Sequence, residues 1–167
     1  MRPDKNLYFM RMARLVATRS TCLRRAVGCV LVDERYHVLS TGYNGVARGE
    51  EHCNFEQVEN PSGNVIRYSY PHACPGANLP SGTGLNQCAA VHAEQNCLCQ
   101  CRDPFAIHTA YVTVAPCDSC LKLFLNTSCK VIMVGGWYHN ADGLSNEAEC
   151  RARWEHDLRA VVLDLRE

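Results

Sequence analysis

Residues 109–135 read TAYVTVAPCDSCLKLFLNTSCKVIMVG, and the order of polar and apolar residues in this stretch decides the fold class. The pattern predicts a strand over 109–114, a helix over 117–126 and a second strand over 130–135. A strand, a helix and a strand in this order imply a right-handed crossover between parallel strands, which the helix covers.

Elements of the same kinds continue on both sides of this stretch. They are a helix over 5–19, a hairpin of strands over 26–32 and 38–43, a helix over 91–101, a helix over 146–158 and a last strand over 160–165. The sequence therefore predicts a three-layer α/β/α fold with a mixed five-stranded sheet, in which an antiparallel hairpin precedes the parallel crossovers.

The length of 167 residues fits one domain that covers residues 1–167. Residues 46–90 differ from the rest because prolines and glycines are frequent there, which disfavours regular elements over most of the segment. We interpret this segment as a loop-rich insertion into the domain.

Charge and composition narrow the range of partners. Seventeen lysines and arginines balance seventeen acidic residues, so the chain has no overall attraction for nucleic acid or an anionic membrane. No apolar stretch reaches the roughly 20 residues that span a bilayer, and the first residues lack the apolar core of a signal peptide. We expect a cytoplasmic protein with a small substrate, no nucleic-acid partner and no membrane partner. In that compartment the twelve cysteines stay reduced, which favours metal ligands and buried thiols over disulfides.

Two short motifs carry the chemistry, His92-Ala93-Glu94 and Pro116-Cys117-Asp118-Ser119-Cys120, and each lies where a helix is predicted to begin. Cys117 and Cys120 are three residues apart, so both thiols lie on one helix face and can share one zinc ion with His92. Three protein ligands leave the fourth tetrahedral position open to water, which is typical of a catalytic zinc. Glu94 is directed at the same cavity, so we predict that it is the catalytic residue that moves the protons.

A second interpretation places the two cysteines in a zinc ribbon and leaves His92 as an ordinary histidine. The intervening strand, Pro116 and Glu94 favour the catalytic interpretation, because the whole set matches the H-x-E and P-C-x-x-C signature of zinc nucleobase deaminases. Asn96 also has two open interpretations, as a residue that caps or orients the start of the helix or as an ordinary polar helix residue.

Several segments together resemble the deoxycytidylate deaminase family, within the zinc-dependent cytidine and deoxycytidylate deaminase superfamily. They are residues 19–25, 27–28, 41–45, 52–53, 79–82, 88, 92–96 and 116–120. The resemblance covers about residues 7–135 and implies a cytidine-deaminase-like fold and the zinc-dependent hydrolysis of dCMP to dUMP and ammonia, which supplies dUMP for dTMP synthesis. It also implies a homo-oligomer, with a hexamer favoured, activation by dCTP, inhibition by dTTP, and Mg²⁺ as the ion that would accompany a dCTP effector.

The same resemblance implies four substrate-binding residues. The Asn44 side chain would hydrogen-bond the deoxyribose, and the backbone N–H of Ala93 would contact the pyrimidine O2. Arg24 and Arg25 offer cations for the 5′-phosphate, although exposed arginines are usually only solvated. A tight hairpin end at Asn44-Gly45, favoured for conformational reasons alone, is the alternative for that segment.

The resemblance further implies a second, structural zinc. Its candidate ligands lie after the first helix, after the hairpin, within the insertion and before the catalytic helix: Cys22, Cys53, Cys74 with His72 as the alternative, and Cys88. Such an ion would order the insertion and offset its chain entropy. The alternative is that these residues are unligated thiols or loop residues.

Two features of the resemblance stay open. Family members often have an arginine eleven residues after the zinc histidine, at a subunit contact associated with regulation, where this chain has Asp103 and places Arg102 one position earlier. Regulation by dCTP and dTTP is therefore in doubt. After the strand over 130–135, either Trp137 or Tyr138 is the aromatic residue that would stack near the base.

Two other functions are compatible with the motifs. A tRNA adenosine deaminase or a single-strand DNA cytosine deaminase has both motif halves but binds a polyanion, which the formal net charge of zero disfavours. A non-enzymatic zinc-binding module would have closed four-ligand sites and no need of Glu94.

Overall fold

The helices and strands of the protein follow the order expected from the sequence. The computed structural model describes residues 2–50, 52–53, 56–63, 65–69, 74–77, 79, 83–84, 87–139, 145–155 and 162–164. Its helices are α1 (Lys5–Ala17), α2 (Ala93–Gln100), the 3-10 helix η2 (Pro104–Ala106), α3 (Asp118–Leu125) and α4 (Glu147–Glu155). Its strands are β1 (Gly28–Val32), β2 (Val38–Tyr43), β3 (Gly45–Val46), β4 (Glu56–Glu59), β5 (Val65–Ser69), β6 (Ala90–Val91), β7 (Thr109–Val112), β8 (Val131–Val134) and β9 (Val162–Asp164). No helix in these ranges has both the length and the apolar character needed to cross a bilayer.

The largest sheet is mixed and has the strand order β2-β1-β7-β8-β9. Strand β1 pairs antiparallel with both β2 and β7, whereas β7, β8 and β9 run parallel. Helix α3 connects β7 to β8, and α4 connects β8 to β9, as expected for crossover connections. The prediction of a mixed α/β sheet covered by helices is therefore confirmed.

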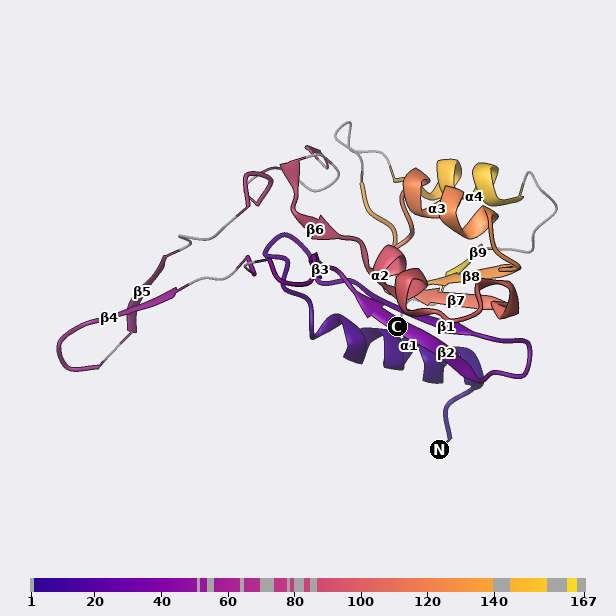
Figure 1. The fold of residues 1–167 in the computed structure, drawn as a ribbon, viewed down its shortest axis with the longest axis horizontal. Helices are drawn as coiled ribbons and strands as arrows, with labels where there is room; N and C mark the ends of the chain where they lie inside the picture. The colour runs from indigo at the N-terminus through magenta and orange to yellow at the C-terminus, as the bar shows by residue number, and fades with distance from the viewer. Residues whose placement is uncertain are drawn as a thin grey trace.

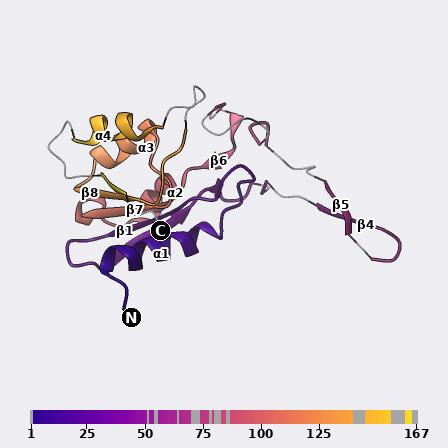
Figure 2. The same cartoon turned by 180° about the vertical axis from the view of Figure 1, so that it is seen from behind.

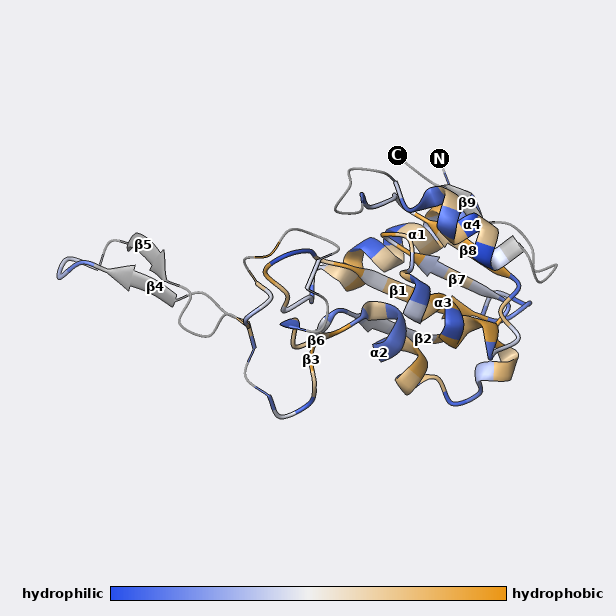
Figure 3. Cartoon of the chain, turned by 90° about the horizontal axis from the view of Figure 1, so that it is seen from above, coloured by the Kyte–Doolittle hydropathy of each residue, from blue (hydrophilic) through white to orange (hydrophobic). Residues whose placement is uncertain are grey.

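Helices cover both faces of this sheet, with α1 on one face and α2, α3 and α4 on the other (Figure 1). On the α1 face, Met10 and Tyr111 belong to one buried apolar cluster. On the opposite face, Cys97, Phe124 and Trp154 belong to a second cluster. Figure 3 shows apolar and hydrophilic residues alternating along the helices that cover the sheet. The second cluster fixes α2 and α3, whose first turns carry the predicted site, on the same side of the sheet.

Two glycines allow helices to approach the sheet at backbone distance. A Cβ atom at Gly28 would overlap the Ala13 carbonyl oxygen of α1. A Cβ atom at Gly42 would overlap the Cys97 nitrogen and the Ala93 carbonyl oxygen of α2. The position of α2 on β2 therefore depends on the absence of a side chain at residue 42.

The segment 46–90 contains paired strands that its prolines and glycines do not indicate. Strands β3 and β6 pair antiparallel across the segment, and β4 and β5 form a hairpin. Figures 1 and 2 both show this hairpin standing apart from the sheet and the helices. Its turn contains a hydrogen bond from the Gly63 N–H to the Asn60 carbonyl, and Gly63 has a positive φ of 78°. The turn residues lie outside the paired stretches, so they interrupt the sequence pattern without preventing the pairing.

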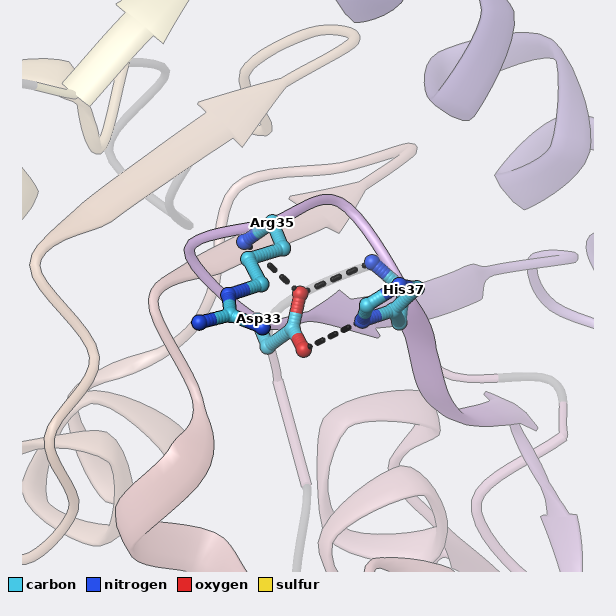
Figure 4. A network of polar contacts seen from close by, with 3 residues as sticks. All are labelled: Asp33, Arg35 and His37. Atoms are coloured by element: carbon cyan, nitrogen blue, oxygen red, sulfur yellow. Dashed lines mark hydrogen bonds and ion pairs between the residues drawn. The ribbon is translucent and has the colours of Figure 1, made fainter.

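The carboxylate of Asp33 closes the turn between β1 and β2 (Figure 4). Its Oδ1 accepts hydrogen bonds from the backbone N–H groups of Arg35 at 2.9 Å and His37 at 2.8 Å, and its Oδ2 lies 2.8 Å from His37 Nδ1. These contacts, the backbone bond from His37 above all, lower the pKa of Asp33. The hairpin predicted from the sequence thus has a turn that its own first residue stabilises.

Candidate active site

The two predicted motifs lie side by side at the starts of α2 and α3. His92 immediately precedes α2, Cys117 immediately precedes α3, and Cys120 lies in the first turn of α3. His92 Nδ1 is 3.5 Å from Cys117 Sγ and 3.4 Å from Cys120 Sγ, and the three ligand atoms all lie within 4.8 Å of one another. The fold therefore brings together the three residues that the motifs single out.

The spacing of these atoms fits a tetrahedral zinc ion. Zinc with a nitrogen ligand at about 2.0 Å and a sulfur ligand at about 2.3 Å separates the two atoms by roughly 3.6 Å. This agrees with the distances of 3.5 Å and 3.4 Å in the structure. A hydrogen bond from the Cys120 thiol lowers the pKa of Cys117 to about 4, and the same bond raises the pKa of Cys120. A divalent cation would hold both as thiolates, because zinc displaces the thiol proton.

A capping interaction fixes the backbone of His92. Gln95 Oε1 accepts a hydrogen bond from the His92 N–H at 3.0 Å. The sequence analysis missed this role, although a glutamine three residues after the residue that precedes a helix is the spacing of a capping box. The bond fixes the point from which the imidazole reaches the two thiols.

Glu94 lies in the first turn of α2, and only 4% of its surface is exposed. Burial raises the pKa of its carboxyl group to about 7. The carboxyl group interacts electrostatically with His92, Cys117 and Cys120, so it lies beside the three candidate zinc ligands. A carboxyl group with this environment can both accept and donate a proton near neutral pH.

An open cleft connects these groups with the predicted substrate-binding residues. It is a partly open cavity that polar and apolar side chains line together, as is usual for a small-molecule site. His92, Glu94 and Cys117 line it together with the four residues expected to bind substrate: Arg24, Arg25, Asn44 and Ala93. The predicted catalytic and binding residues thus share one cavity.

Asn44 fixes the loop between α1 and β1. Its Oδ1 accepts hydrogen bonds from the Val27 N–H and the Ser20 hydroxyl, both at 2.7 Å, and its Nδ2 donates to the Arg25 carbonyl at 2.6 Å. An amide nitrogen has two N–H groups, so a second donor can face a ligand in the cleft. The segment is not a tight hairpin end, because β2 pairs with β1 while β3 pairs with β6.

The two arginines occupy different positions in the cleft wall. Arg24 Nη2 donates to the Thr83 carbonyl at 3.0 Å, which links the wall to the insertion. The Arg25 guanidinium lies over the Tyr138 ring, 5.9 Å from its centroid. Arg25 therefore stacks on an aromatic side chain that also lines the cleft.

Tyr138, and not Trp137, is the aromatic residue of the cleft. Tyr138 lines the cavity, whereas Trp137 packs against the hydrophobic core and lies 5.4 Å from the Arg151 guanidinium. Asn146, which is 2% exposed, accepts a hydrogen bond from the Tyr138 N–H through Oδ1 at 3.2 Å. Sequence reasoning missed Asn146, because nothing in the local pattern links it to a residue eight positions earlier.

The four cysteines predicted for a second zinc lie near one another at the edge of this cleft. The Cys74 side chain hydrogen-bonds the thiols of Cys53 and Cys88, and Cys22 interacts electrostatically with Cys53 and Cys88. Their sulfur atoms are more widely spaced than the ligand atoms at His92, because no three of them lie within 4.8 Å of one another in the described part of the chain. The alternative ligand His72 lies outside the described residues. None of the twelve cysteines, all of which the structure describes, forms a disulfide.

Comparisons with known proteins agree with this site. The family model for the cytidine and deoxycytidylate deaminase zinc-binding region matches residues 3–136. The chain is 34% identical over 140 residues to a deoxycytidylate deaminase of Saccharomyces cerevisiae, and the match covers 83% of this chain and 39% of the yeast protein. It is 40% identical over 123 residues to a deoxycytidylate deaminase of Mycobacterium phage D29, and this match covers 73% of this chain and 87% of the phage protein. The chain thus spans well under half the length of the yeast relative.

A solved structure shows the same fold. The dCMP deaminase of cyanophage S-TIM5, in complex with dCMP and dUMP, aligns with a TM-score of 0.64 at 20% identity and covers 99% of both chains. At this identity the alignment supports the arrangement of sheet and helices described above.

Proposed function

Because the chain belongs to the cytidine and deoxycytidylate deaminase family, we propose that it hydrolyses dCMP to dUMP and ammonia and so supplies dUMP for dTMP synthesis. One observation carries this proposal: a buried carboxyl group, that of Glu94, lies beside three zinc-type ligands in one cleft. Twelve cysteines that form no disulfide suit a reducing compartment, and we propose that the protein works in the cytoplasm.

His92, Cys117 and Cys120 would hold the zinc ion. When bound, zinc supplies the Lewis acidity that lowers the pKa of water from 15.7 to about 7. Glu94 accepts a proton from the attacking water and delivers it to the ring nitrogen N3, which prepares C4 for the new C–O bond. The same carboxylate then takes the proton of the new C4 hydroxyl group and passes it to the amino group, so that the C4–N bond breaks, the C4=O bond forms and ammonia leaves. The overall change consumes one water molecule for each dCMP.

The cleft wall supplies the groups that would select a deoxynucleotide. We assign the second N–H of the Asn44 amide to the deoxyribose and the backbone N–H of Ala93 to the pyrimidine O2. Arg25 is the better candidate for the 5′-phosphate, because Arg24 already donates to the Thr83 carbonyl. We assign Tyr138, which lines the cleft, to stacking on the base.

An ultraviolet assay of several substrates tests this function. We expect turnover of dCMP, and a kcat/KM for deoxycytidine at least about tenfold lower, because loss of one charge-assisted hydrogen bond removes about 1.5–3 kcal/mol. We expect dCTP to be deaminated more slowly than dCMP. We expect no deamination of adenosine in tRNA. Deamination of tRNA, or of no cytosine nucleotide at all, would disprove the proposal.

Family membership also leads us to propose a homo-oligomer, with a hexamer favoured, and regulation by dCTP and dTTP with Mg²⁺ accompanying dCTP. At position 103, where family members often have an arginine at the regulatory contact, Asp103 Oδ1 accepts a hydrogen bond from the Phe105 N–H at 2.9 Å and caps η2. The dCMP assay with each nucleotide added measures this regulation directly.

We further propose that Cys22, Cys53, Cys74 and Cys88 bind a second, structural zinc. The thiols of three of them already form a hydrogen-bonded chain, and Cys22 lies close enough to two of them to interact. They come from the loop after α1, from the segment before β4, and from the two ends of the segment before β6. One ion would therefore tie the insertion to the cleft wall, which Cys22 and Cys88 line.

Zinc stoichiometry tests the second site. We expect two ions per chain in the wild type, and one ion and a lower melting temperature in the Cys53→Ser variant, because an unligated insertion loses its anchor. The Cys99→Ser variant, which changes an exposed cysteine, should keep both ions. A content of one zinc ion per wild-type chain would contradict the proposed second site.

A further inference from the structure

Two amide side chains attach the catalytic helix to an edge strand. Strand β2 lies at the edge of the sheet, so the carbonyl groups that face away from β1 have no neighbouring strand. The Asn96 Nδ2 donates to the Tyr43 carbonyl at 2.9 Å, and the Gln100 Nε2 donates to the Thr41 carbonyl at 3.2 Å. Residues four apart on a helix and two apart on a strand are each about 6–7 Å apart along the chain axis, so the two rows match.

The two bonds differ in the further hydrogen bonds that the accepting peptide groups make. The Tyr43 carbonyl belongs to the peptide group whose N–H is that of Asn44, and this N–H donates to the Val27 carbonyl at 3.1 Å. One peptide group therefore joins α2 on one side and the loop before β1 on the other. The Thr41 carbonyl lies two residues further from the cleft, within β2.

The connection continues into the cleft wall through the Asn44 side chain. Its bonds to the Ser20 hydroxyl, the Val27 N–H and the Arg25 carbonyl hold the loop that carries the cleft arginines. Asn96 itself lies two residues after Glu94 on α2. A series of hydrogen bonds thus runs from the helix of the metal ligand, through residue 44, to the loop that faces the substrate.

From this arrangement we propose that Asn96 is a positioning residue: its bond to the Tyr43 carbonyl sets the distance between the catalytic end of α2 and the wall formed by Asn44 and Arg25. This inference rests on the proposed function for its kinetic consequence. Glu94 and His92 stay in place without Asn96 because they are part of α2 and its cap. The wall formed by Asn44 and Arg25 does not stay in place without this bond. Its loss therefore raises KM for dCMP far more than it lowers kcat.

The Asn96→Ala variant, with Gln100→Ala as its matched control, tests the proposal. Both changes remove one side-chain bond to an edge carbonyl of β2, and Gln100→Ala also removes the bond from Gln100 Nε2 to the Asn96 carbonyl at 3.2 Å. For Asn96→Ala we expect a rise in KM of about tenfold with kcat within about threefold of the wild type, and unchanged zinc content. For Gln100→Ala we expect both constants to be unchanged, although both variants lose stability. Asn96→Asp keeps the volume but cannot donate from that side chain, so it should behave like Asn96→Ala if the alanine variant folds poorly.

Hydrogen exchange tests the positioning role of Asn96 without any substrate. Measured by mass spectrometry on the whole protein, the amides of residues 20–27 and 44 should exchange faster in Asn96→Ala than in Gln100→Ala or the wild type. Equal exchange in the two variants would overturn the positioning role, and so would equal KM values in an active enzyme. A wild type that exchanges as expected but does not act on dCMP would disprove the proposed function and leave the positioning role standing.

Discussion

Changing Glu94 to alanine is expected to lower kcat for dCMP by about 10²- to 10⁴-fold, which is the usual contribution of a positioned general acid and base. The effect is large because no other carboxyl group lines the cleft in the part of the chain that the structure describes. The variant should still bind zinc, since His92, Cys117 and Cys120 are all retained. Single-turnover ultraviolet kinetics and metal analysis on the same sample measure the two results together.

The Glu94→Gln variant separates proton transfer from packing. Glutamine keeps the volume of this buried side chain but cannot accept the proton, so its kcat should fall as far as that of the alanine variant. Glu34→Gln, in the exposed turn between β1 and β2, serves as the control and should be fully active. If Glu94→Gln kept a tenth of the wild-type rate, another group would have to carry the protons.

Removal of one metal ligand should have a different and equally large result. In Cys120→Ala only His92 and Cys117 are left, and two ligands do not retain a zinc ion under ordinary buffer conditions. We expect one zinc ion fewer per chain and the loss of all measurable dCMP turnover, because water is no longer activated. Metal analysis after dialysis, followed by the kinetic assay, gives both values.

A variant at another buried cysteine is the control for Cys120→Ala. Cys129 is fully buried like Cys120 but lies outside the cleft, between α3 and β8, so Cys129→Ala should keep its zinc and its activity at some cost in stability. A Cys120→Ala protein that retains its full zinc content would contradict the assignment of the three ligands. Comparison with Glu94→Ala then distinguishes loss of the metal from loss of proton transfer.

The parts of the fold that repeat a local pattern could be predicted from the sequence. The strand and helix boundaries of 109–135 are set by alternating apolar runs, and the structure has β7, α3 and β8 there. The three ligand positions were also predictable, since Cys117 and Cys120 lie three residues apart at the start of one predicted helix and His92 lies at the start of another. Each of these two motifs spans only a few residues, and the fold brings them together.

Features that depend on distant partners could not be predicted in this way. The Asn44 side chain bonds Ser20, Val27 and Arg25, and no spacing rule connects residue 44 to residue 20. The choice between two neighbouring aromatic residues, Trp137 and Tyr138, depends on how the chain turns after β8. The β4–β5 hairpin was not predicted, because the prolines and glycines around its two short paired stretches indicate a loop.

Gly42 limits how this active site can change. A methyl group there would collide with the backbone of α2 at Ala93 and Cys97, so any other residue must lift that helix from the sheet. His92 and Glu94 would rise with it, while Cys117 and Cys120 on α3 would stay where they are. Each catalytic residue can be substituted without moving α2, but a side chain larger than hydrogen at residue 42 displaces the whole helix.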